Sequence, residues 1–339
     1  MKAIEIQNKF GLDSLALVER PEPTPGPGEA LIRVRATSLN YRDLLTVEGR
    51  YNPKQPLPLV PLSDGVGEVV AVGEGVTRVK VGDRVAANFS QGWIAGEPTR
   101  DKLRASLGGP LDGMLVEYRA LREEGLVHVP EHLSDEEAAS LPCAAVTAWH
   151  ALIVQGNLKA GATVLVQGTG GVSLFALQFA VMAGARVIVT SSSDEKLERA
   201  RALGASDGIN YKTTPDWDKA ARDLTGGVGV DHIVEVGGAG TFAKSLRAIR
   251  IGGHISVIGN LAGNTGDLSL IPILMQNLRV QGVLVGSREM FEAMNRAIAL
   301  HKMKPVVDKV FPMEEARAAF EHMAAGAHFG KIAVRLREG

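Results

Sequence analysis

The stretch Thr163–Ser173 reads TVLVQGTGGVS and is the part of the chain that determines the fold class. Its first five residues are typical of a short buried strand, and the apolar run from Ser173 to Met182 indicates a buried helix. Between them stands the pattern Gly168-x-Gly170-x-x-Ser173. The first glycine permits a tight turn, and the second lets the backbone approach a pyrophosphate at the positive end of the helix. This context favours a dinucleotide site over an ordinary strand–turn–helix unit, although Ser173 replaces the usual third glycine.

The segment that follows alternates between strand-like and helix-like runs. Arg186–Thr190 is β-branched and apolar, and Asp194–Leu203 is charged, with Ser192 and Glu195 spaced as in a capping box at its start. Further strands are expected at Asp207–Asn210, His232–Val236, His254–Ile258 and Val280–Val285. Alternating strands and helices predict an α/β fold with a doubly wound parallel sheet covered on both faces.

The first hundred residues have a different pattern, which is typical of β-structure. Glu29–Ala36 and Gly67–Val72 are β-branched, apolar runs bounded by glycine and proline. Asn88–Asp112 is polar and long for a loop, so we expect it to be either disordered or functional. Its Phe89 and Trp93 could close over an apolar substrate.

Composition and charge limit the classes of function. The chain has 339 residues, enough for two domains, and its 37 basic and 38 acidic residues leave a net charge of −1. A chain without a basic excess is not expected to bind nucleic acid or an anionic membrane. A single cysteine excludes an intrachain disulfide, and Met1–Ile6 alternates like a strand and not like a signal peptide. We therefore expect a cytoplasmic enzyme with a small-molecule substrate.

The residues after the second strand indicate which dinucleotide is bound. An NAD site usually has a carboxylate there, which accepts a hydrogen bond from the ribose 2′-hydroxyl. This chain has Ser191, Ser192 and Ser193, which carry no negative charge to repel a 2′-phosphate, and Lys196 follows one turn later. A lysine there supplies a positive charge to that phosphate. NADP(H) is therefore expected over NAD(H); the alternative is that Lys196 is a solvated surface lysine.

Four short motifs carry a resemblance that covers nearly the whole chain. They are VGDRV at Val81–Val85, GTGGV at Gly168–Val172, INY at Ile209–Tyr211 and GKI at Gly330–Ile332. In these motifs the chain resembles the medium-chain dehydrogenase/reductase superfamily, in its zinc-independent quinone oxidoreductase and enoyl reductase-like branch. The resemblance implies a GroES-like β-barrel catalytic domain, residues 1–130 and 288–339, and a Rossmann NADP-binding domain, residues 131–287.

The resemblance also implies which residues contact the cofactor. Lys196 and Tyr211 match a lysine and a tyrosine that flank the adenosine 2′-phosphate in such quinone reductases, which adds to the NADP(H) prediction. The full set of implied contacts is Thr147, Gly168, Thr169, Gly170, Gly171, Val172, Ser191, Ser192, Lys196, Tyr211, Val236, Gly237, Ile258, Gly259, Asn260, Val283, Val285, Gly330 and Lys331.

The same resemblance predicts that no zinc is bound. Zinc-dependent relatives hold catalytic zinc through a cysteine, a histidine and a second cysteine, and the matching residues here are Asn40, Ser63 and Cys143. Asparagine and serine bind zinc poorly, and a catalytic site needs three protein ligands and a water. The counterpart of the structural-zinc lobe, Asn88–Asp112, contains no cysteine. Cys143 is expected to be a packed cysteine near the domain junction.

Without a metal, hydrogen-bond donors must stabilise negative charge on the substrate oxygen as hydride arrives. In the family the segment Asn40-Tyr41-Arg42 lines the cleft, so these three residues are the expected catalytic donors. Leu44 and Leu45 stand where quinone reductases often have a tyrosine, which makes Tyr41 the candidate proton donor.

A site built from donors suits reduction of an activated alkene or a quinone, because charge then moves onto a remote oxygen. A metal-free alcohol dehydrogenase or carbonyl reductase is the first alternative. An NADP(H)-binding protein with little turnover is the alternative from another class. We expect Asp43 and Asp64 to have structural roles beside these donors.

The family usually assembles through the nucleotide-binding domains, whose edge strands pair. The apolar run Leu268–Leu274, followed by Leu278–Val285, could supply such an edge. A homodimer is therefore expected, and a tetramer is the alternative.

Overall fold

The computed structural model describes residues 1–266 and 268–336. The chain divides into two compact units. Unit 1 consists of Met1–Val146 with Gly286–Gly339, and unit 2 consists of Thr147–Val285. As the resemblance implies, the unit that contains the N-terminal half is completed by the C-terminal part of the chain.

The first boundary lies at Val146 and not at residue 130. The segment after residue 130 contains the helix α3 (Asp135–Ala139), which packs against the strands β3 (Glu29–Ser38) and β4 (Asp64–Val72). Since its contacts are with unit 1, this segment belongs to that unit and not to unit 2.

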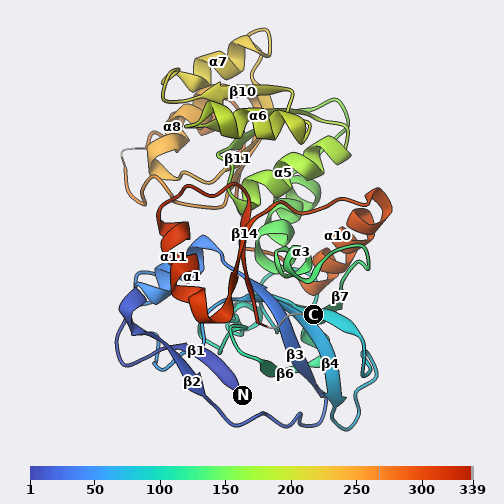
Figure 1. The fold of residues 1–339 in the computed structure, drawn as a ribbon. Coiled ribbons are helices and arrows are strands. Elements are labelled where there is room, and N and C mark those ends of the chain that lie inside the picture. Colours follow the sequence, from blue (N-terminus) through green and yellow to red (C-terminus); the bar gives the residue numbers. More distant parts are fainter. Residues whose placement is uncertain (267, 337–339) are drawn as a thin grey trace. The chain divides into compact units, whose positions relative to one another are not determined.

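Unit 2 is built on a parallel sheet whose strands are linked by helices (Figure 1). The strands are β8 (Thr163–Gln167), β9 (Arg186–Ser191), β10 (Asp207–Asn210), β11 (Val230–Glu235), β12 (Ile249–Val257) and β13 (Arg279–Gly282). The helices are α5 (Gly171–Met182), α6 (Asp194–Ala202), α7 (Trp217–Asp223), α8 (Ala239–Ala248) and α9 (Ile271–Met275). The sheet order is β10-β9-β8-β11-β12-β13 and all five neighbouring pairs are parallel, which confirms the doubly wound fold.

The core of unit 2 explains why these apolar runs become central strands. Leu165, Ile188, Ile233 and Ile255 lie on four neighbouring strands and are buried in one cluster. The large side chains of α7 and α8, including Trp217, cover this cluster. When helices cover both faces of a sheet, the sequence of each central strand is a nearly continuous apolar run. This is the pattern seen from Thr163 onward.

Unit 1 contains a larger and mostly antiparallel sheet. Its strands are β1 (Lys2–Ile6), β2 (Leu15–Glu19), β3, β4, β5 (Arg84–Ala87), β6 (Tyr118–Arg122), β7 (Leu126–His128), β14 (Val307–Pro312) and β15 (Lys331–Arg335). Its helices are α1 (Tyr41–Val47), α2 (Arg100–Leu103), α3, α10 (Arg288–His301) and α11 (Ala316–Ala324). The main sheet has the order β14-β15-β3-β4-β5-β7, with β6 paired to β3 and a separate β1–β2 hairpin.

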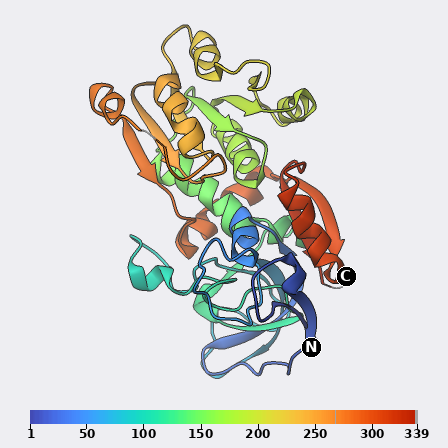
Figure 2. The same ribbon diagram turned by 90° about the vertical axis from the view of Figure 1, so that its left-hand side faces the viewer.

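Two segments far apart in sequence meet in this sheet. β15, at the end of the described chain, pairs antiparallel with β3, so that Ala333 lies opposite Ser38. The helix α11 packs along β14 and β15, as the red helix and strand in Figure 2 show. The pairing brings the start of β15 next to the end of β3, where the predicted catalytic segment begins.

The long segment Asn88–Asp112 is ordered, and its two ends pack into unit 1 whereas residues 95–101 are exposed. It forms the short helix α2, seen in turquoise in Figure 2, and isolated bridges join Ser90 to Ser106. Trp93 is 1% exposed and Phe89 is 4% exposed. These two aromatic side chains are therefore packed inside unit 1, and the expectation that they close over a substrate is wrong.

A helical segment runs through Leu141–Ala145, Val146–Trp149 (α4) and His150–Gln155, with π-helical turns at both ends.

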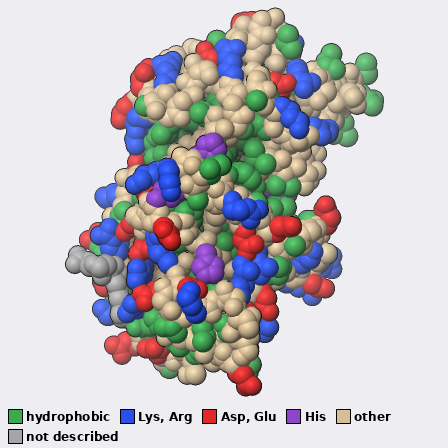
Figure 3. Space-filling view, turned by 90° about the vertical axis from the view of Figure 1, so that its right-hand side faces the viewer, with side chains coloured by type: hydrophobic (Ala, Val, Ile, Leu, Met, Phe, Trp, Pro, Cys, Tyr) green, Lys and Arg blue, Asp and Glu red, His purple; other side chains and the backbone are tan. Residues whose placement is uncertain are grey.

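Within the described residues, no helix is long and apolar enough to cross a membrane. On the face shown in Figure 3, basic and acidic side chains are interspersed, as the balanced charge predicts.

Candidate active site

The glycine loop joins β8 to α5 in the conformation that the sequence pattern requires. Gly168 has a φ of 73°, a left-handed conformation that strongly favours glycine. Gly170 is the N-cap of the 12-residue helix α5, and no side chain caps the helix there. A Cβ atom on Gly170 would meet nothing within 4 Å. The first N–H groups of α5 are thus open to a ligand, and such a helix N-terminus suits a pyrophosphate.

Ser173 stands in place of the third glycine, and the structure shows why a serine is tolerated. Its side chain is buried, and its Oγ donates to the backbone oxygen of Gln167 at 2.7 Å. This bond ties the first turn of α5 to the end of β8. The close helix–strand packing that a glycine would allow is therefore kept by a hydrogen bond.

A buried polar network, which the sequence analysis did not predict, holds the turn that follows β11. Glu235, at the end of β11, is fully buried and accepts from Gln167 Nε2 at 2.7 Å. It also accepts from the N–H groups of Gly237 and Gly238 at 2.9 and 3.0 Å. Gln167 Oε1 accepts from the N–H of Val236 at 3.3 Å. The available signal was a carboxylate at the end of an apolar strand, because a buried carboxylate must find donors.

The ends of β9 and β10 bring two predicted cofactor contacts, Ser191 and Tyr211, to neighbouring places. Asn210 lies opposite Ser191 in the parallel pair, and the N–H of Tyr211 donates to the backbone oxygen of Ser191 at 3.0 Å. Tyr211 is 43% exposed, whereas Ser191 is buried. Tyr211 is therefore the accessible member of this pair.

The start of α6 differs by one residue from the predicted capping box. Ser193, and not Ser192, is the N-cap, and its Oγ accepts from the N–H of Lys196 at 3.3 Å. The reason is that β9 extends to Ser191 and the helix begins only at Asp194. Lys196 consequently lies in the first turn of α6, close in the chain to the end of β9.

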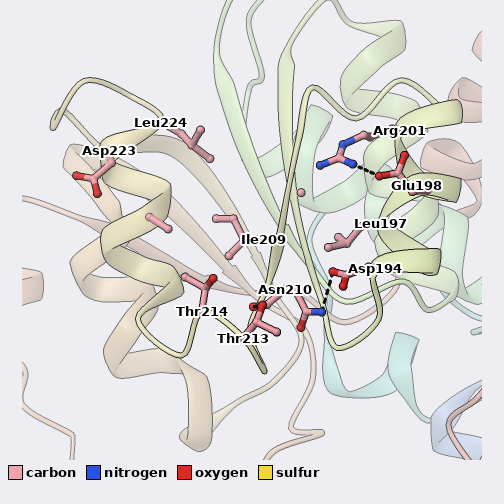
Figure 4. A pocket seen from close by; sticks show the side chains of 12 residues that line it. Asp194, Leu197, Glu198, Arg201, Ile209, Asn210, Thr213, Thr214, Asp223 and Leu224 are labelled. Carbon is pink, nitrogen blue, oxygen red and sulfur yellow. Dashed lines mark hydrogen bonds and ion pairs between the residues drawn. The ribbon is translucent and has the colours of Figure 1, made fainter.

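A cavity of about 660 Å³ opens beside β10, between α6 and α7 (Figure 4). Its lining includes Leu197 and Ile209 as an apolar floor and Asp194, Glu198 and Asp223 as acidic groups. In Figure 4 the carboxylate of Asp194 is bonded to the amide of Asn210. No residue of the glycine loop lines this cavity. The three carboxylates outnumber the one cation of the lining, Arg201, whose guanidinium pairs with Glu198, so the cavity is not suited to the cofactor phosphate.

The other predicted cofactor contacts of unit 2 follow the carboxyl ends of parallel strands, which share one edge of the sheet. Val236 and Gly237 follow β11, Ile258–Asn260 follows β12, and Val283 and Val285 follow β13. Val283, Val285, Gly237 and Thr147, the last on α4, are buried. The structure thus brings most of these residues to one edge, although the contacts themselves stay predictions.

In unit 1, the predicted donor Asn40 belongs to a buried polar cluster. Its backbone N–H donates to Asp43 Oδ2 at 2.8 Å at the start of α1. Its side-chain Oδ1 accepts from Lys331 Nζ at 2.6 Å, and its Nδ2 donates to Ser63 Oγ at 3.4 Å. Asn40 is 8% exposed, whereas Lys331 is 2% exposed. Both partners of this hydrogen bond are therefore buried inside unit 1.

Asp64, at the start of β4, is the anionic centre of the cluster and is fully buried. Its Oδ1 accepts from Ser63 Oγ at 2.7 Å, and its Oδ2 accepts from the N–H of Cys143 at 3.3 Å. Lys331 Nζ lies 3.7 Å from the same Oδ2. Burial, together with Asp64, raises the pKa of the Cys143 thiol. The thiol is consequently neutral and packed, as predicted for this cysteine.

Lys331 thus has a different place from the one that the resemblance implies. Its ammonium donates to Leu39 O at 2.7 Å and to Asn40 Oδ1, inside unit 1. Asp64 Oδ2 is its third neighbour, at the ion-pair distance of 3.7 Å, so the charge of the ammonium is balanced within the chain. The preceding residue Gly330, also a predicted cofactor contact, has a φ of 93°. A Cβ there would lie 2.4 Å from Val306 O, so the glycine is explained by packing.

Arg42, the third predicted donor, is also used inside unit 1. Its guanidinium donates to the backbone oxygens of Leu107, Gly108 and Gly109 at 2.9 to 3.1 Å and to Asp43 Oδ1 at 3.1 Å. Burial raises the pKa of Asp43, and Arg42 opposes that effect. Arg42 therefore anchors the end of the long loop segment, and the expectation of a donor to substrate does not fit its contacts. Tyr41, by contrast, is 38% exposed and its ring is accessible.

The chain is similar to known proteins in both of its units. Residues 26–131 match the family model of the alcohol dehydrogenase GroES-like domain, and residues 171–299 match that of the zinc-binding dehydrogenases. A zinc-type alcohol dehydrogenase-like protein of Schizosaccharomyces pombe is 46% identical over 96% of each chain. An acryloyl-coenzyme A reductase of Metallosphaera sedula is 31% identical over 98% of this chain and 99% of its own.

Several solved structures are similar to nearly the whole chain. One from Sinorhizobium meliloti, described as an alcohol dehydrogenase, has 42% identity and a TM-score of 0.91 over 99% of both chains. A structure described as an NAD-dependent alcohol dehydrogenase has 36% identity and a TM-score of 0.92, over 99% of this chain and all of that one. A mycobacterial protein complexed with NADPH has 27% identity and a TM-score of 0.83 over the same shares.

The fold and these similarities define a nucleotide-binding oxidoreductase with a GroES-like domain and a Rossmann domain. The chain belongs to the medium-chain dehydrogenase/reductase superfamily.

The matching family description names zinc, so the donor set was compared with what zinc requires. The three residues at the matching positions are Asn40, Ser63 and Cys143, of which only the cysteine is a usual zinc ligand. That thiol is held neutral, and the ammonium of Lys331 already lies against Asn40 and Asp64. Among the described residues, no group of three or more histidine, cysteine, aspartate or glutamate side chains is placed to hold a metal. These residues do not fit a catalytic zinc.

Proposed function

We propose that the protein is an NADP(H)-dependent, zinc-independent reductase of activated alkenes or quinones. The observation that carries the proposal is the buried Asn40 amide, whose Oδ1 accepts from Lys331 Nζ at 2.6 Å, so that its Nδ2 is the donor at a position that matches a metal ligand of the zinc relatives. Hydride addition to a conjugated carbon moves negative charge onto a remote oxygen, and a hydrogen-bond donor can stabilise that charge. The acryloyl-coenzyme A reductase among the relatives acts, by its name, on an activated alkene, which supports this chemistry.

The glycine loop and the end of β9 support NADP(H) as the cofactor. The open N-terminus of α5 and Gly168–Gly171 would hold the pyrophosphate, and Lys196 and Tyr211 would meet the 2′-phosphate. When bound, the reduced cofactor supplies the hydride. The NADPH complex among the structural neighbours supports this choice, whereas the NAD-dependent neighbour is the reason to measure both cofactors.

Two residues of unit 1 perform the remaining chemistry in this proposal. Asn40 donates from Nδ2 to the substrate oxygen, on which charge develops as hydride arrives. Tyr41, whose ring is accessible on the first turn of α1, gives a proton to the reduced substrate. Arg42 and Asp43 hold α1 and the loop in place, so that both donors keep their positions.

A metal-free carbonyl reductase is the second candidate. The alcohol dehydrogenase names of several relatives favour it, and Tyr41 would then protonate the alkoxide directly. In this reaction the full negative charge of an alkoxide develops on the substrate oxygen. Without a metal ion, side chains alone must stabilise that charge.

The deciding experiment follows NADPH oxidation with a conjugated enone and with its saturated ketone, after the zinc content of the purified protein has been measured. Turnover of the enone alone, by protein without zinc, is the expected result. Turnover of the saturated ketone alone would favour the carbonyl reductase, and activity that requires added zinc would contradict the proposal. Repeating the assay with NADH tests the cofactor preference.

We also propose that the protein is a homodimer that pairs through the edge strand β13. Every residue of β13 is exposed, and Leu270, Ile271 and Leu274 beside it are 67%, 62% and 74% exposed. The predicted edge differs in detail, because Ile271–Met275 forms the helix α9, with Pro272 in its first turn, and only Arg279–Gly282 is a strand. Light scattering should give twice the chain mass for the wild type and the monomer mass for Leu274→Asp; a wild-type monomer would contradict the proposal.

A further inference from the structure

The ammonium of Lys331 lies in the polar cluster of unit 1 and is almost completely buried. Lys331 begins β15, is 2% exposed, and meets three acceptors: Leu39 O at 2.7 Å, Asn40 Oδ1 at 2.6 Å and Asp64 Oδ2 at 3.7 Å. A buried charge is costly unless it is paired and hydrogen-bonded. Two hydrogen bonds and one ion pair meet this requirement inside the chain.

The distances separate the hydrogen bonds of the Lys331 ammonium from its ion pair. The ion pair with Asp64 is the longest of the three contacts, at 3.7 Å, whereas the bond to Asn40 Oδ1 is the shortest, at 2.6 Å. Asp64 also has other partners, because Ser63 Oγ donates to it at 2.7 Å and the N–H of Cys143 at 3.3 Å. The geometry therefore makes the amide of Asn40 a direct hydrogen-bond partner of the lysine, as is Leu39 O at 2.7 Å, whereas Asp64 pairs with it by charge alone.

This contact decides which way the Asn40 amide points. An ammonium can only donate, so the atom that faces Lys331 must be Oδ1 and cannot be Nδ2. Nδ2 is then turned to the opposite side, where Ser63 Oγ at 3.4 Å is its partner among the described residues. Because Ser63 Oγ donates its proton to Asp64, it can serve Asn40 only as an acceptor. Both ends of the network thus agree on a single orientation of the amide.

We infer that Lys331 is a positioning residue that fixes the Asn40 amide with Oδ1 inward and Nδ2 available as the donor to substrate. The positive charge behind Oδ1 also polarises the amide and strengthens its N–H as a donor. The cluster thereby obtains a fixed cation from the chain itself, at the positions that match the metal ligands of zinc relatives. This inference rests on the proposed function for its effect on turnover, but the orientation of Asn40 can be tested without any substrate.

A double-mutant cycle tests whether Lys331 acts through Asn40. Lys331→Met is expected to lower kcat for the enone by about tenfold to a hundredfold, with KM changed less, since the oriented donor acts mainly in the transition state. In an Asn40→Ala background the same substitution should have little further effect on kcat, because the amide is gone. Equal fold losses in both backgrounds would show that Lys331 acts independently of Asn40, and would overturn the inference.

Two further variants separate positioning from general stability. Lys331→Gln keeps a donor toward Asn40 Oδ1 and is expected to retain more activity than Lys331→Met; equal losses would contradict positioning by a hydrogen bond. Lys309→Met is the matched control, because Lys309 is exposed on β14, opposite Ile332 of β15, and takes no part in the cluster. If Lys331→Met does not fold, Asp64→Asn/Lys331→Met replaces it, with Asp64→Asn as its reference, because no unpaired buried carboxylate is then left.

A measurement without substrate completes the test. In protein labelled with ¹⁵N-asparagine, the side-chain amide resonance of Asn40, assigned through Asn40→Ala, should shift in Lys331→Met and stay in place in Lys309→Met. An unshifted resonance in Lys331→Met would overturn the inference even if the enone is a substrate. If the wild type does not reduce the enone but the resonance shifts, the proposed function fails and the positioning of Asn40 by Lys331 stands.

Discussion

Acidification should destabilise unit 2 through a pair of buried histidines. His232 on β11 and His254 on β12 lie opposite each other in the parallel sheet, with ring centroids 5.8 Å apart. They are 8% and 3% exposed, and their Nδ1 atoms have no hydrogen-bond partner among the described residues. Burial is the main cause that lowers the pKa of both rings, and for His232 the neighbouring His254 lowers it further.

The size of the effect follows from the pKa of His232. Its pKa falls from the ordinary value of 6.5 to about 4 in the folded protein. Between these values the unfolded chain binds a proton that the folded chain does not, so the free energy of unfolding decreases as the pH falls through this window. At about 1.4 kcal/mol for each pKa unit, the full loss is about 3 kcal/mol, of which about 2 kcal/mol is lost between pH 7 and pH 5. The lowered pKa of His254 acts in the same direction.

Urea unfolding at pH 7 and pH 5, followed by circular dichroism, measures this loss. His232→Gln removes one titrating ring, so its free energy of unfolding should fall by about 2 kcal/mol less than that of the wild type between the two pH values. His301→Gln is the control, because His301 is exposed at the end of α10 and its ring is solvated in both states. If His232→Gln and the wild type lose the same stability on acidification, the reasoning from buried rings is refuted.

Three further predictions concern the cofactor loop, the cofactor preference and the loop anchor. Gly170→Ala should leave urea stability unchanged, because a Cβ there meets nothing within 4 Å, but it should weaken NADPH binding in calorimetry; unchanged affinity would argue against a pyrophosphate at this loop. Lys196→Glu should lower the ratio of kcat/KM for NADPH over NADH by about tenfold or more, as expected for loss of one charge-assisted contact, and an unchanged ratio would mean that Lys196 is a surface lysine. Arg42→Gln should reduce the free energy of unfolding by about 2 kcal/mol, because it leaves the backbone oxygens of 107–109 without their donor; a loss of kcat at unchanged stability would instead restore Arg42 as a donor to substrate.

Much of unit 2 could be predicted because its signals are local. The strand, the glycine turn and the helix of Thr163–Ser173 are consecutive in the chain, and each residue type there is required by the backbone conformation of its own position. The alternation of strands and helices then specified a parallel sheet, because parallel strands need a crossover between them. The limits of this reasoning appear at element ends: the N-cap of α6 is Ser193 and not Ser192, because the length of β9 decides where the helix begins.

The interior of unit 1 was much harder to predict. Phe89 and Trp93 looked like residues of a mobile loop, since nothing adjacent in the chain shows that they are covered. Arg42 looked like a donor for substrate, because its acceptors are backbone oxygens, which every residue carries and no motif marks. The type of a polar side chain shows which hydrogen bonds it can donate or accept. It does not show which partner the fold brings to it.

The class of fold, the glycine loop and the kinds of donor available could be predicted from the chain, because those properties depend on residues that are neighbours in it. The role of Lys331 could not, because it depends on a contact that forms only in the folded protein. Its partner Asn40 is 291 positions away, and the two meet only because β15 pairs with β3 inside a discontinuous unit. Because the ammonium of Lys331 is buried, losing its hydrogen-bond acceptors would be costly. It therefore holds the amide of Asn40 in one orientation.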